Sequence, residues 1–217
     1  MSRTIDPADS FANPRNYELA KKGLLKLREV LDGLGVEWYL AHGTLLGCVR
    51  EHDLIPHDFD LDVPVNEHTD LTKVEYALVS AAFFPQILPP EKYLYRGDRF
   101  GMTLSLPGAR LGEPWDVSVD IWKQYTLNEN EVFEPYEKGP WVWVYDEHNV
   151  RTGGHATYDK IIFPRPTKIV RVPFLGSDFP IPENYDAILT AEYGNWHEID
   201  PNWTTGDAKT FGLWTPE

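Results

Sequence analysis

Residues 39–65 read YLAHGTLLGCVREHDLIPHDFDLDVPV, and the end of this stretch decides the fold because acidic and apolar residues alternate there. Successive side chains of a strand point to opposite faces, so a strand over 59–65 places Asp58, Asp60 and Asp62 together on the face away from the core. Carboxylates at this spacing repel one another unless a positive charge lies among them. Oxygen ligands on a rigid strand suit Mg²⁺ or Mn²⁺ carrying substrate phosphates, and we expect a site for one of these ions.

A glycine and a threonine precede the acidic strand. Gly43 is suited to a tight turn, and Thr44 is a natural N-cap for a short helix over 45–50. A Gly-Thr turn at a helix start presents backbone N–H groups and a hydroxyl to an anion, so this turn is a candidate phosphate site, with a plain N-cap as the alternative. Arg50 either clamps substrate phosphates or satisfies the dipole at the helix C-terminus.

A second acidic strand is predicted further along the chain. Residues 100–106 and 115–122 have the pattern of two strands joined by a Pro-Gly turn, which predicts a hairpin beside the first acidic strand. Asp120 lies between apolar residues and is expected to be a third metal ligand or the base that accepts a proton from the acceptor hydroxyl. Asp116 lies on the same face and competes with it for that role.

The rest of the chain is organised as one domain. We expect a flexible N-terminal arm over 1–15 and a single domain over 16–217. Apolar periodicity and breakers predict the following elements: a helix from Asn16 to near Gly33 and Gly35, a short strand over 36–41, a helix over 67–82, long loops with short strands over 123–180, and a helix over 184–193 closed by Gly194.

Composition excludes several classes of protein. The 217 residues carry 20 basic and 34 acidic side chains, a net charge of -14, which is the wrong sign for gripping a nucleic-acid backbone. The single cysteine, Cys48, allows no internal disulfide and no multi-cysteine zinc site. Neither a signal peptide nor a long apolar run is evident, so the sequence predicts a soluble, cytoplasmic protein without a membrane segment.

Two motifs resemble a known family. HGTLLGCVREHDLIPHDFDLDV at 42–63 is similar to the LicD and fukutin-related signature, whose usual form is close to HGTLLGAVRHGGFIPWDDDIDI, and FPIPENYDAILTAEYGNWHEIDP at 179–201 resembles the family's ending. The resemblance implies an α+β (α/β type) nucleotidyltransferase fold, a mixed central sheet flanked by helices with loop-rich insertions. It also implies that Asp60, Asp62 and Asp120 hold the divalent ion.

The same resemblance implies an activity. Family members transfer a phospho-alcohol or phospho-sugar unit, such as phosphocholine or ribitol phosphate, from a CDP-activated donor to a sugar or glycan hydroxyl. One family acid is replaced by Phe59, which leaves Asp58 as a supporting partner of the site or a turn cap. Two alternatives therefore stay open: a catalytically silent relative that binds a nucleotide or glycan, and a nucleotidyltransferase that acts on a small molecule.

Histidines and aromatic residues invite further interpretations. His42 is expected to be a packed or capping histidine. The His-Asp pairs at 52–53 and 57–58 suggest a metal-dependent phosphohydrolase, but the intervening proline argues against the helices that such a site needs. Trp141, Trp143 and Tyr145 are candidates for a cage around a quaternary ammonium group, with one face of a core as the alternative.

Overall fold

The computed structural model describes residues 7–86, 94–95, 98–108, 117–138, 157–200 and 211–213. Its elements follow the chain in this order: η1 (Pro7–Asp9), α1 (Pro14–Leu34), α2 (His42–Leu46), η2 (Gly47–Glu51), β1 (Asp60–Asn66), α3 (Leu71–Ser80), β2 (Phe84–Pro85), β3 (Leu94–Tyr95), β4 (Asp98–Arg99), β5 (Gly101–Ser105), β6 (Ser118–Thr126), β7 (Glu131–Lys138), β8 (Thr157–Pro164), β9 (Ile169–Phe174), β10 (Ser177–Pro182), α4 (Tyr185–Tyr193) and β11 (Phe211–Leu213).

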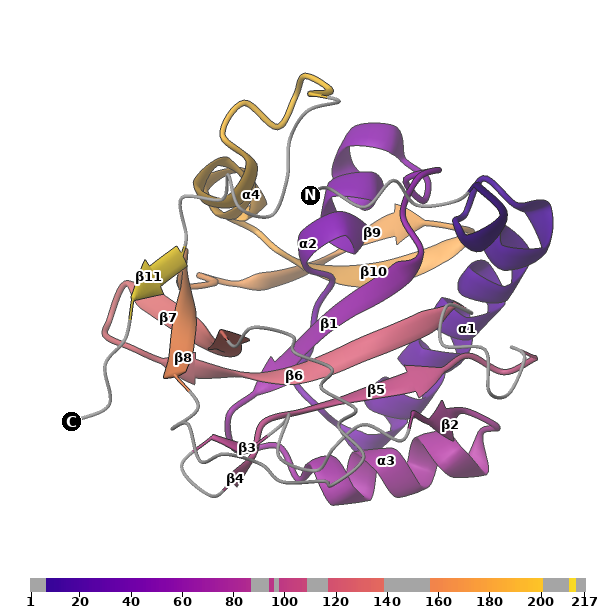
Figure 1. Cartoon of the computed structure of the whole chain (residues 1–217), viewed down its shortest axis with the longest axis horizontal. Coiled ribbons are helices and arrows are strands. Elements are labelled where there is room, and N and C mark those ends of the chain that lie inside the picture. Colours follow the sequence, from indigo (N-terminus) through magenta and orange to yellow (C-terminus); the bar gives the residue numbers. More distant parts are fainter. Residues whose placement is uncertain are drawn as a thin grey trace, which may run out of the picture.

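A mixed sheet of seven strands forms the centre of the molecule (Figure 1). Its order is β11-β8-β7-β6-β5-β2, and β1 pairs in parallel with β6 on the side away from β5. β1 pairs with β6 as far as Gln124, and β7 pairs with the next two residues of β6, Tyr125 and Thr126. The predicted β5–β6 hairpin beside the acidic strand is confirmed.

Local sequence explains the helices that position the site. α1 begins after Asn13, whose side chain accepts a hydrogen bond from the Arg15 N–H, and it ends at Gly35, which takes the left-handed conformation with φ 67°. α3 begins after Asp70, which caps it through two backbone N–H groups. α1, α3 and α4 agree with the predicted helices within a few residues at each end. The largest difference is at α3, which is shorter than the predicted helix over 67–82.

The N-terminal arm differs from its prediction. Ser10 and Phe11 are buried, and α1 already begins at Pro14. The Phe11 N–H donates to the Asp58 carbonyl at 2.8 Å, and the Ala12 N–H donates to the Pro56 carbonyl at 2.6 Å. The segment from Ser10 onward therefore supports the loop that leads to the acidic strand. The polar composition of 1–15 gives no sign of such backbone pairing.

Two further expectations need correction. Residues 36–41 form no strand; Trp38 makes an isolated bridge to Val65 instead. Residues 123–180 hold longer strands than predicted, since β7 and β8 have eight residues each and β9 pairs with β10. Proline and glycine in this region concealed the strand pattern. Trp141, Trp143 and Tyr145 lie outside the described residues.

One main apolar cluster holds the layers together. Leu24, Leu27 and Leu31 of α1 pack in it with the apolar side chains of β1, β5, β6 and α3. Figure 1 shows α1 and α3 beside one another, with α2 and α4 at the other end of the view. Among the described residues, no helix has the length and apolar character needed to span a membrane.

Candidate active site

The register between β1 and β6 brings the predicted acids together. Asp62 lies opposite Asp120, and Asp60 lies opposite Ser118. Because paired residues of neighbouring strands share a face, Asp60, Asp62 and Asp120 face the same side of the sheet. Asp58 lies two residues before β1, and its Oδ1 accepts a hydrogen bond from the Phe59 N–H. Asp116 lies outside the described residues, so its competition with Asp120 stays a prediction.

Burial makes this array electrostatically unfavourable. Burial and the charges of Asp62, Asp58 and Asp120 raise the pKa of Asp60 well above its usual range. Burial also raises the pKa of Asp62 well above its usual range; the Asp58 and Asp120 charges add to this effect, and His42 opposes it. Two carboxylates about 4.5 Å apart repel by roughly 4 kcal/mol at an effective dielectric constant of about 20. A cation among these side chains would relieve the repulsion.

The donor set fits a hard divalent ion, because every candidate ligand is a carboxylate oxygen on or beside a strand. Burial raises the pKa of Asp58 as well, and the Phe59 backbone N–H and the His57 charge oppose this effect. Within the part of the chain that the structure describes, no three His, Cys, Asp or Glu side chains already converge as a finished metal site. The backbone register therefore supplies the grouping of the acids, and side-chain rotation would have to complete a coordination shell.

The Gly-Thr turn is built differently from its prediction. α2 begins at His42, its N-cap is Ala41, and Thr44 lies inside the helix rather than at its start. The Thr44 Oγ1 accepts a hydrogen bond of 2.9 Å from the buried Asp62 N–H. A Cβ at Gly43 would collide with Asp58 Oδ2, so the glycine permits the close approach of that carboxylate. Thr44 holds the acidic strand, and a phosphate contact at Gly43 and Thr44 stays a prediction.

Arg50 connects two segments that are distant in sequence. Its Nε donates to Glu51 Oε1 at 2.7 Å, and its Nη1 donates to the Trp196 carbonyl at 3.3 Å. The bond to Trp196 ties η2 to the segment after α4. Phosphate clamping by Arg50 would require this guanidinium to exchange partners, and it also stays a prediction.

Asp58 and Phe59 lie at the entry to β1. Asp58 Oδ1 accepts a hydrogen bond of 3.0 Å from the Phe59 N–H, as a turn cap does. Phe59 is half-buried and just precedes the strand, whereas Leu61 and Val63 are fully buried, as the alternation predicted. Strand alternation would point Phe59 toward the core, but the residue lies before β1 and is only half-buried.

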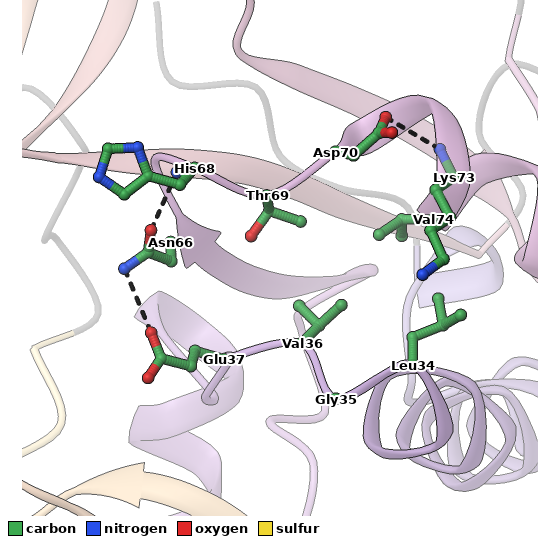
Figure 2. Close-up of a pocket in the computed structure, with 10 residues that line it drawn as sticks. All are labelled: Leu34, Gly35, Val36, Glu37, Asn66, His68, Thr69, Asp70, Lys73 and Val74. Atoms are coloured by element: carbon green, nitrogen blue, oxygen red, sulfur yellow. Dashed lines mark hydrogen bonds between the residues drawn. The ribbon is translucent and has the colours of Figure 1, made fainter.

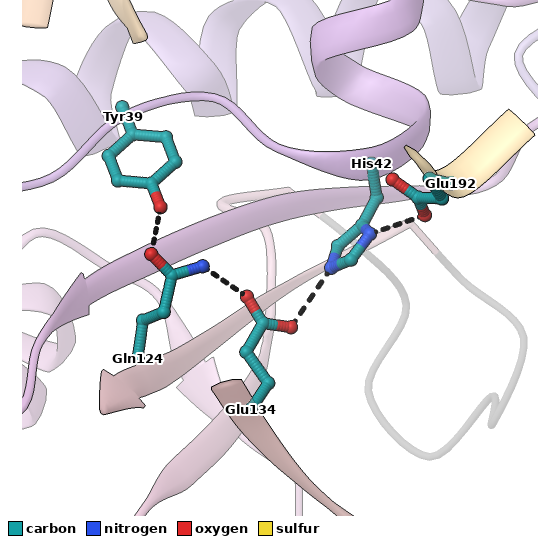
Figure 3. A network of polar contacts seen from close by, with 5 residues as sticks. All are labelled: Tyr39, His42, Gln124, Glu134 and Glu192. Carbon is teal, nitrogen blue, oxygen red and sulfur yellow. Dashed lines mark hydrogen bonds and ion pairs between the residues drawn. The ribbon is translucent and has the colours of Figure 1, made fainter. Parts of the chain in front are cut away.

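Sequence reasoning missed a buried polar network beside the acids (Figure 3). His42 Nδ1 lies 2.6 Å from Glu192 Oε1 on α4, and His42 Nε2 lies 3.1 Å from Glu134 Oε2 on β7. Gln124 Nε2 donates to Glu134 Oε1 at 3.0 Å, and the Tyr39 hydroxyl donates to Gln124 Oε1. The partners of His42 are 92 and 150 residues away in the chain, so no local spacing could have indicated them.

His42 is held as an imidazolium. Burial alone would lower its pKa, but the Glu192 and Glu134 carboxylates outweigh that effect and raise the pKa well above the usual value. The geometry supports the charged form, because each ring nitrogen faces a carboxylate oxygen. Only the imidazolium form can donate a hydrogen bond from both nitrogens. The ring also packs against Trp122 and Phe163, with centroids 5.3 and 5.4 Å away. His42 is therefore a positive charge close to the acidic array.

Tyr193 completes the surroundings of the acids at the end of α4. Burial and the charges of Glu192, Asp62 and Asp58 raise the pKa of its phenol well above 10. A phenol that remains protonated is a hydrogen-bond donor among carboxylates. The end of α4 thus contributes both Glu192 and Tyr193 to the site, although the sequence indicated this helix only as an element of the fold.

A separate hollow of about 420 Å³ lies at the opposite end of β1, where α1 ends and α3 begins (Figure 2). Its polar groups are largely engaged: Asp70 caps α3, Asn66 Nδ2 donates to Glu37 Oε2 at 3.2 Å, and the His68 N–H donates to Asn66 Oδ1 at 2.9 Å. The acids lie at the start of β1, away from this hollow.

One protein family matches most of this chain. A family model described as "LicD/FKTN/FKRP, nucleotidyltransferase domain" matches residues 35–184. The human and mouse proteins named ribitol 5-phosphate transferase FKRP are each 26% identical over 167 residues, which cover 76% of this chain and 29% of each relative. An uncharacterized protein of Rickettsia typhi is 30% identical over 92 residues, 39% of this chain and 26% of that protein.

The chain was also compared with solved structures. The lincomycin-bound lincosamide antibiotic adenylyltransferase LnuA has 14% sequence identity and a TM-score of 0.44, covering 79% of this chain and 85% of its own. The chain spans less than a third of the length of the curated relatives that it matches.

Proposed function

Because the chain belongs to the LicD/FKTN/FKRP family, we propose that it transfers a phospho-alcohol or phospho-sugar unit from a nucleotide-activated donor to a sugar or glycan hydroxyl. The matched region is the family's nucleotidyltransferase domain, and the mixed sheet flanked by helices agrees with the expected fold class. One observation carries the proposal: Asp62 of β1 is paired directly with Asp120 of β6, with Asp60 on the same face.

The proposed roles follow from this arrangement. Asp60, Asp62 and Asp120 would hold Mg²⁺ or Mn²⁺, which when bound neutralises the donor's phosphates and makes the phosphorus more electrophilic. Asp58 lies at the entry to β1, and its charge acts on Asp60. His42 offsets part of the negative charge that acts on Asp62. The main chain at Asp62 is fixed by α2, so its carboxylate is presented from a rigid strand.

The reaction is a substitution at phosphorus. The acceptor oxygen forms a bond to the phosphorus that bears the alcohol or sugar, and the bond from this phosphorus to the oxygen bridging the nucleotide breaks. With a CDP-linked donor, CMP leaves and the hydroxyl proton passes to a base; Asp120 is the candidate for this role as the alternative to its role as a metal ligand. The human and mouse relatives are named ribitol 5-phosphate transferases, which supports ribitol phosphate as one unit to test, beside phosphocholine.

A ligand panel tests the proposal. The folded protein is heated with CDP-ribitol, CDP-choline, CDP-glycerol or nucleoside triphosphates, each with and without Mg²⁺ or Mn²⁺. A ligand that binds only the folded state raises apparent stability by about 2.7 kcal/mol at 100 times its Kd. With a CDP-linked donor we expect a metal-dependent rise in the unfolding midpoint. Mass spectrometry of the reaction should show the acceptor carrying the phosphorylated unit, together with released CMP.

Other outcomes separate the alternatives. Donor binding that is indifferent to metal, with no product, contradicts the proposal and favours a catalytically silent relative. A product that carries the nucleotide monophosphate, with pyrophosphate released from a triphosphate, means nucleotidyl transfer instead.

A further inference from the structure

We infer that His42 is a positioning residue that fixes the main chain of Asp62 by clamping α2 between β7 and α4. The inference deepens the proposed function, on which its catalytic meaning rests. Its structural content, the placement of Asp62 by His42, can be measured without any transfer reaction.

The first step is the attachment of Asp62 to α2. The Ala41 N–H donates to the Asp62 carbonyl at 3.2 Å, and the Asp62 N–H donates to Thr44 Oγ1 at 2.9 Å. Both backbone polar groups of Asp62 are therefore held by the first turn of α2. Any movement of that turn is transmitted to Asp62.

The second step is the position of His42 within that turn. His42 lies between Ala41 and Thr44 and has a φ of 46°, a backbone conformation that residues other than glycine rarely adopt. Such a conformation persists when surrounding contacts enforce it. The side chain of His42 makes polar contacts with Glu134 and Glu192 and packs against Trp122 and Phe163, and these contacts hold the residue in place.

The third step is the rigidity of the clamp itself. The side chains of Glu134 and Glu192 are only 5% and 10% exposed, and that of His42 is 15% exposed. Glu134 is fixed in turn by Gln124 of β6. Removing the imidazolium would leave two buried carboxylates without their shared cation, and breaking a buried pair in this way is strongly destabilising. The surroundings of α2 would then rearrange, and Asp62 with them.

The test uses His42→Gln and Glu192→Gln in the full chain. The first variant removes the charge, and the second keeps a side-chain oxygen that can accept from Nδ1–H. Arg171→Gln is the matched control, because Arg171 Nη2 pairs with Asp32 Oδ1 at 2.6 Å between β9 and α1, outside this network. Amide hydrogen exchange at Asp62, Mn²⁺ affinity without donor, and the thermal midpoint are measured for each protein.

We expect exchange at the Asp62 amide to rise at least about 10-fold more in His42→Gln than exchange at the α1 amides of Leu24 and Leu27. Mn²⁺ affinity should fall roughly 10-fold, within the range seen when residues that orient metal ligands are removed. Glu192→Gln should give a smaller change of the same kind. Arg171→Gln should lower only the thermal midpoint.

The inference is overturned if exchange at Asp62 rises no more than at the α1 amides, because His42 would then stabilise the fold without placing Asp62. If His42→Gln does not fold, the same comparison on Glu192→Gln decides. If the wild-type protein binds Mn²⁺ but transfers nothing, the proposed function fails while the inference stands or falls on exchange and affinity. If it binds no Mn²⁺, exchange alone decides.

Discussion

Asp62 is the residue at which the structural constraints on the site meet. Its backbone is bonded to α2, its neighbour across the sheet is Asp120, and its side chain is nearly buried. Leaving so many carboxylates in a buried position opposes folding unless a cation is bound. Function and stability should therefore conflict at this residue.

The first prediction concerns that conflict. Asp62→Asn should stabilise the metal-free protein by on the order of 1 kcal/mol, about 2–4 °C in the thermal midpoint, since it removes a charge from the repelling array. The same change should weaken Mn²⁺ binding. Differential scanning calorimetry and metal titration measure both effects. A lower midpoint together with unchanged Mn²⁺ affinity would show that the carboxylate has a structural role.

The second prediction concerns pH. The pKa of His42 is raised in the folded protein, so its ion pairs contribute fully below the unfolded pKa near 6.5, and this contribution is lost as pH rises through the folded pKa. The difference in unfolding free energy between the wild-type protein and His42→Gln should therefore be largest at pH 6 and shrink toward high pH. Urea unfolding from pH 6 to pH 10 measures it.

A histidine outside the network provides the control for this pH series. His68 is exposed, and His68→Gln should change stability little at any of these pH values. A wild-type minus His42→Gln difference that stays constant with pH would mean that His42 contributes by packing rather than by charge.

Single residues also show where sequence reasoning stops. The alternation around Asp60 and Asp62 was enough to predict which side chains share a face, because that depends only on strand geometry. The roles of Thr44 and His42 were not predictable, since a hydroxyl or an imidazole takes its role from whichever partner the fold brings near. For Thr44 that partner is the Asp62 amide, 18 residues away.

At the scale of elements, the junction of α2 with η2 is packed tightly against the loop before β1. A Cβ at Gly47 would lie 2.7 Å from the Asp53 carbonyl oxygen, which belongs to the backbone and cannot simply rotate away. The junction places the acid loop and α2 in fixed relation, so overpacking here should disturb both.

The third prediction follows from this contact. Gly47→Ala should destabilise the protein by about 1–3 kcal/mol, as overpacking commonly does. Gly33→Ala is the matched control: it lies in α1 with nothing within 4 Å of the added methyl group, and should stabilise by about 0.5–1 kcal/mol. Urea unfolding compares the two variants. Equal effects would show that the close approach at Gly47 is relieved without consequence.

Elements with strong local signals were predicted well. α1 carries a cap, a regular apolar stripe and a terminal glycine, and the first residues of β1 and β6 alternate between acidic or polar and apolar side chains. The expected strand over 36–41 failed because its apolar run is satisfied by packing and a single bridge to Val65 rather than by a ladder. β7 and β8 were missed because a strand pair is defined by a distant partner, and their pairing joins segments on either side of 139–156.

At the scale of the whole molecule, the fold class followed from the acidic alternation and its resemblance to a family, both of which depend on short stretches. The connection of α2, β7 and α4 around His42 depends instead on the complete fold. The net charge of -14 adds to the burden on the acidic array, because a cation bound there reduces repulsion across the molecule as well as locally.

The fourth prediction uses this charge. Mg²⁺ or Mn²⁺ should raise the thermal midpoint of the wild-type protein more than the same ionic strength of NaCl, because specific binding to the acids adds to general screening. In Asp60→Asn plus Asp62→Asn the two salts should act alike. An equal effect of both salts on the wild-type protein would indicate screening alone.

The most direct test of the central claim is product formation from a CDP-linked donor and a sugar acceptor, followed by mass spectrometry with and without Mn²⁺. The account predicts CMP and a phosphodiester product only with the metal, and loss of both in Asp60→Asn plus Asp62→Asn. Undiminished product in the double variant, or in the presence of a chelator, would contradict the claim that these carboxylates hold the ion on which transfer depends.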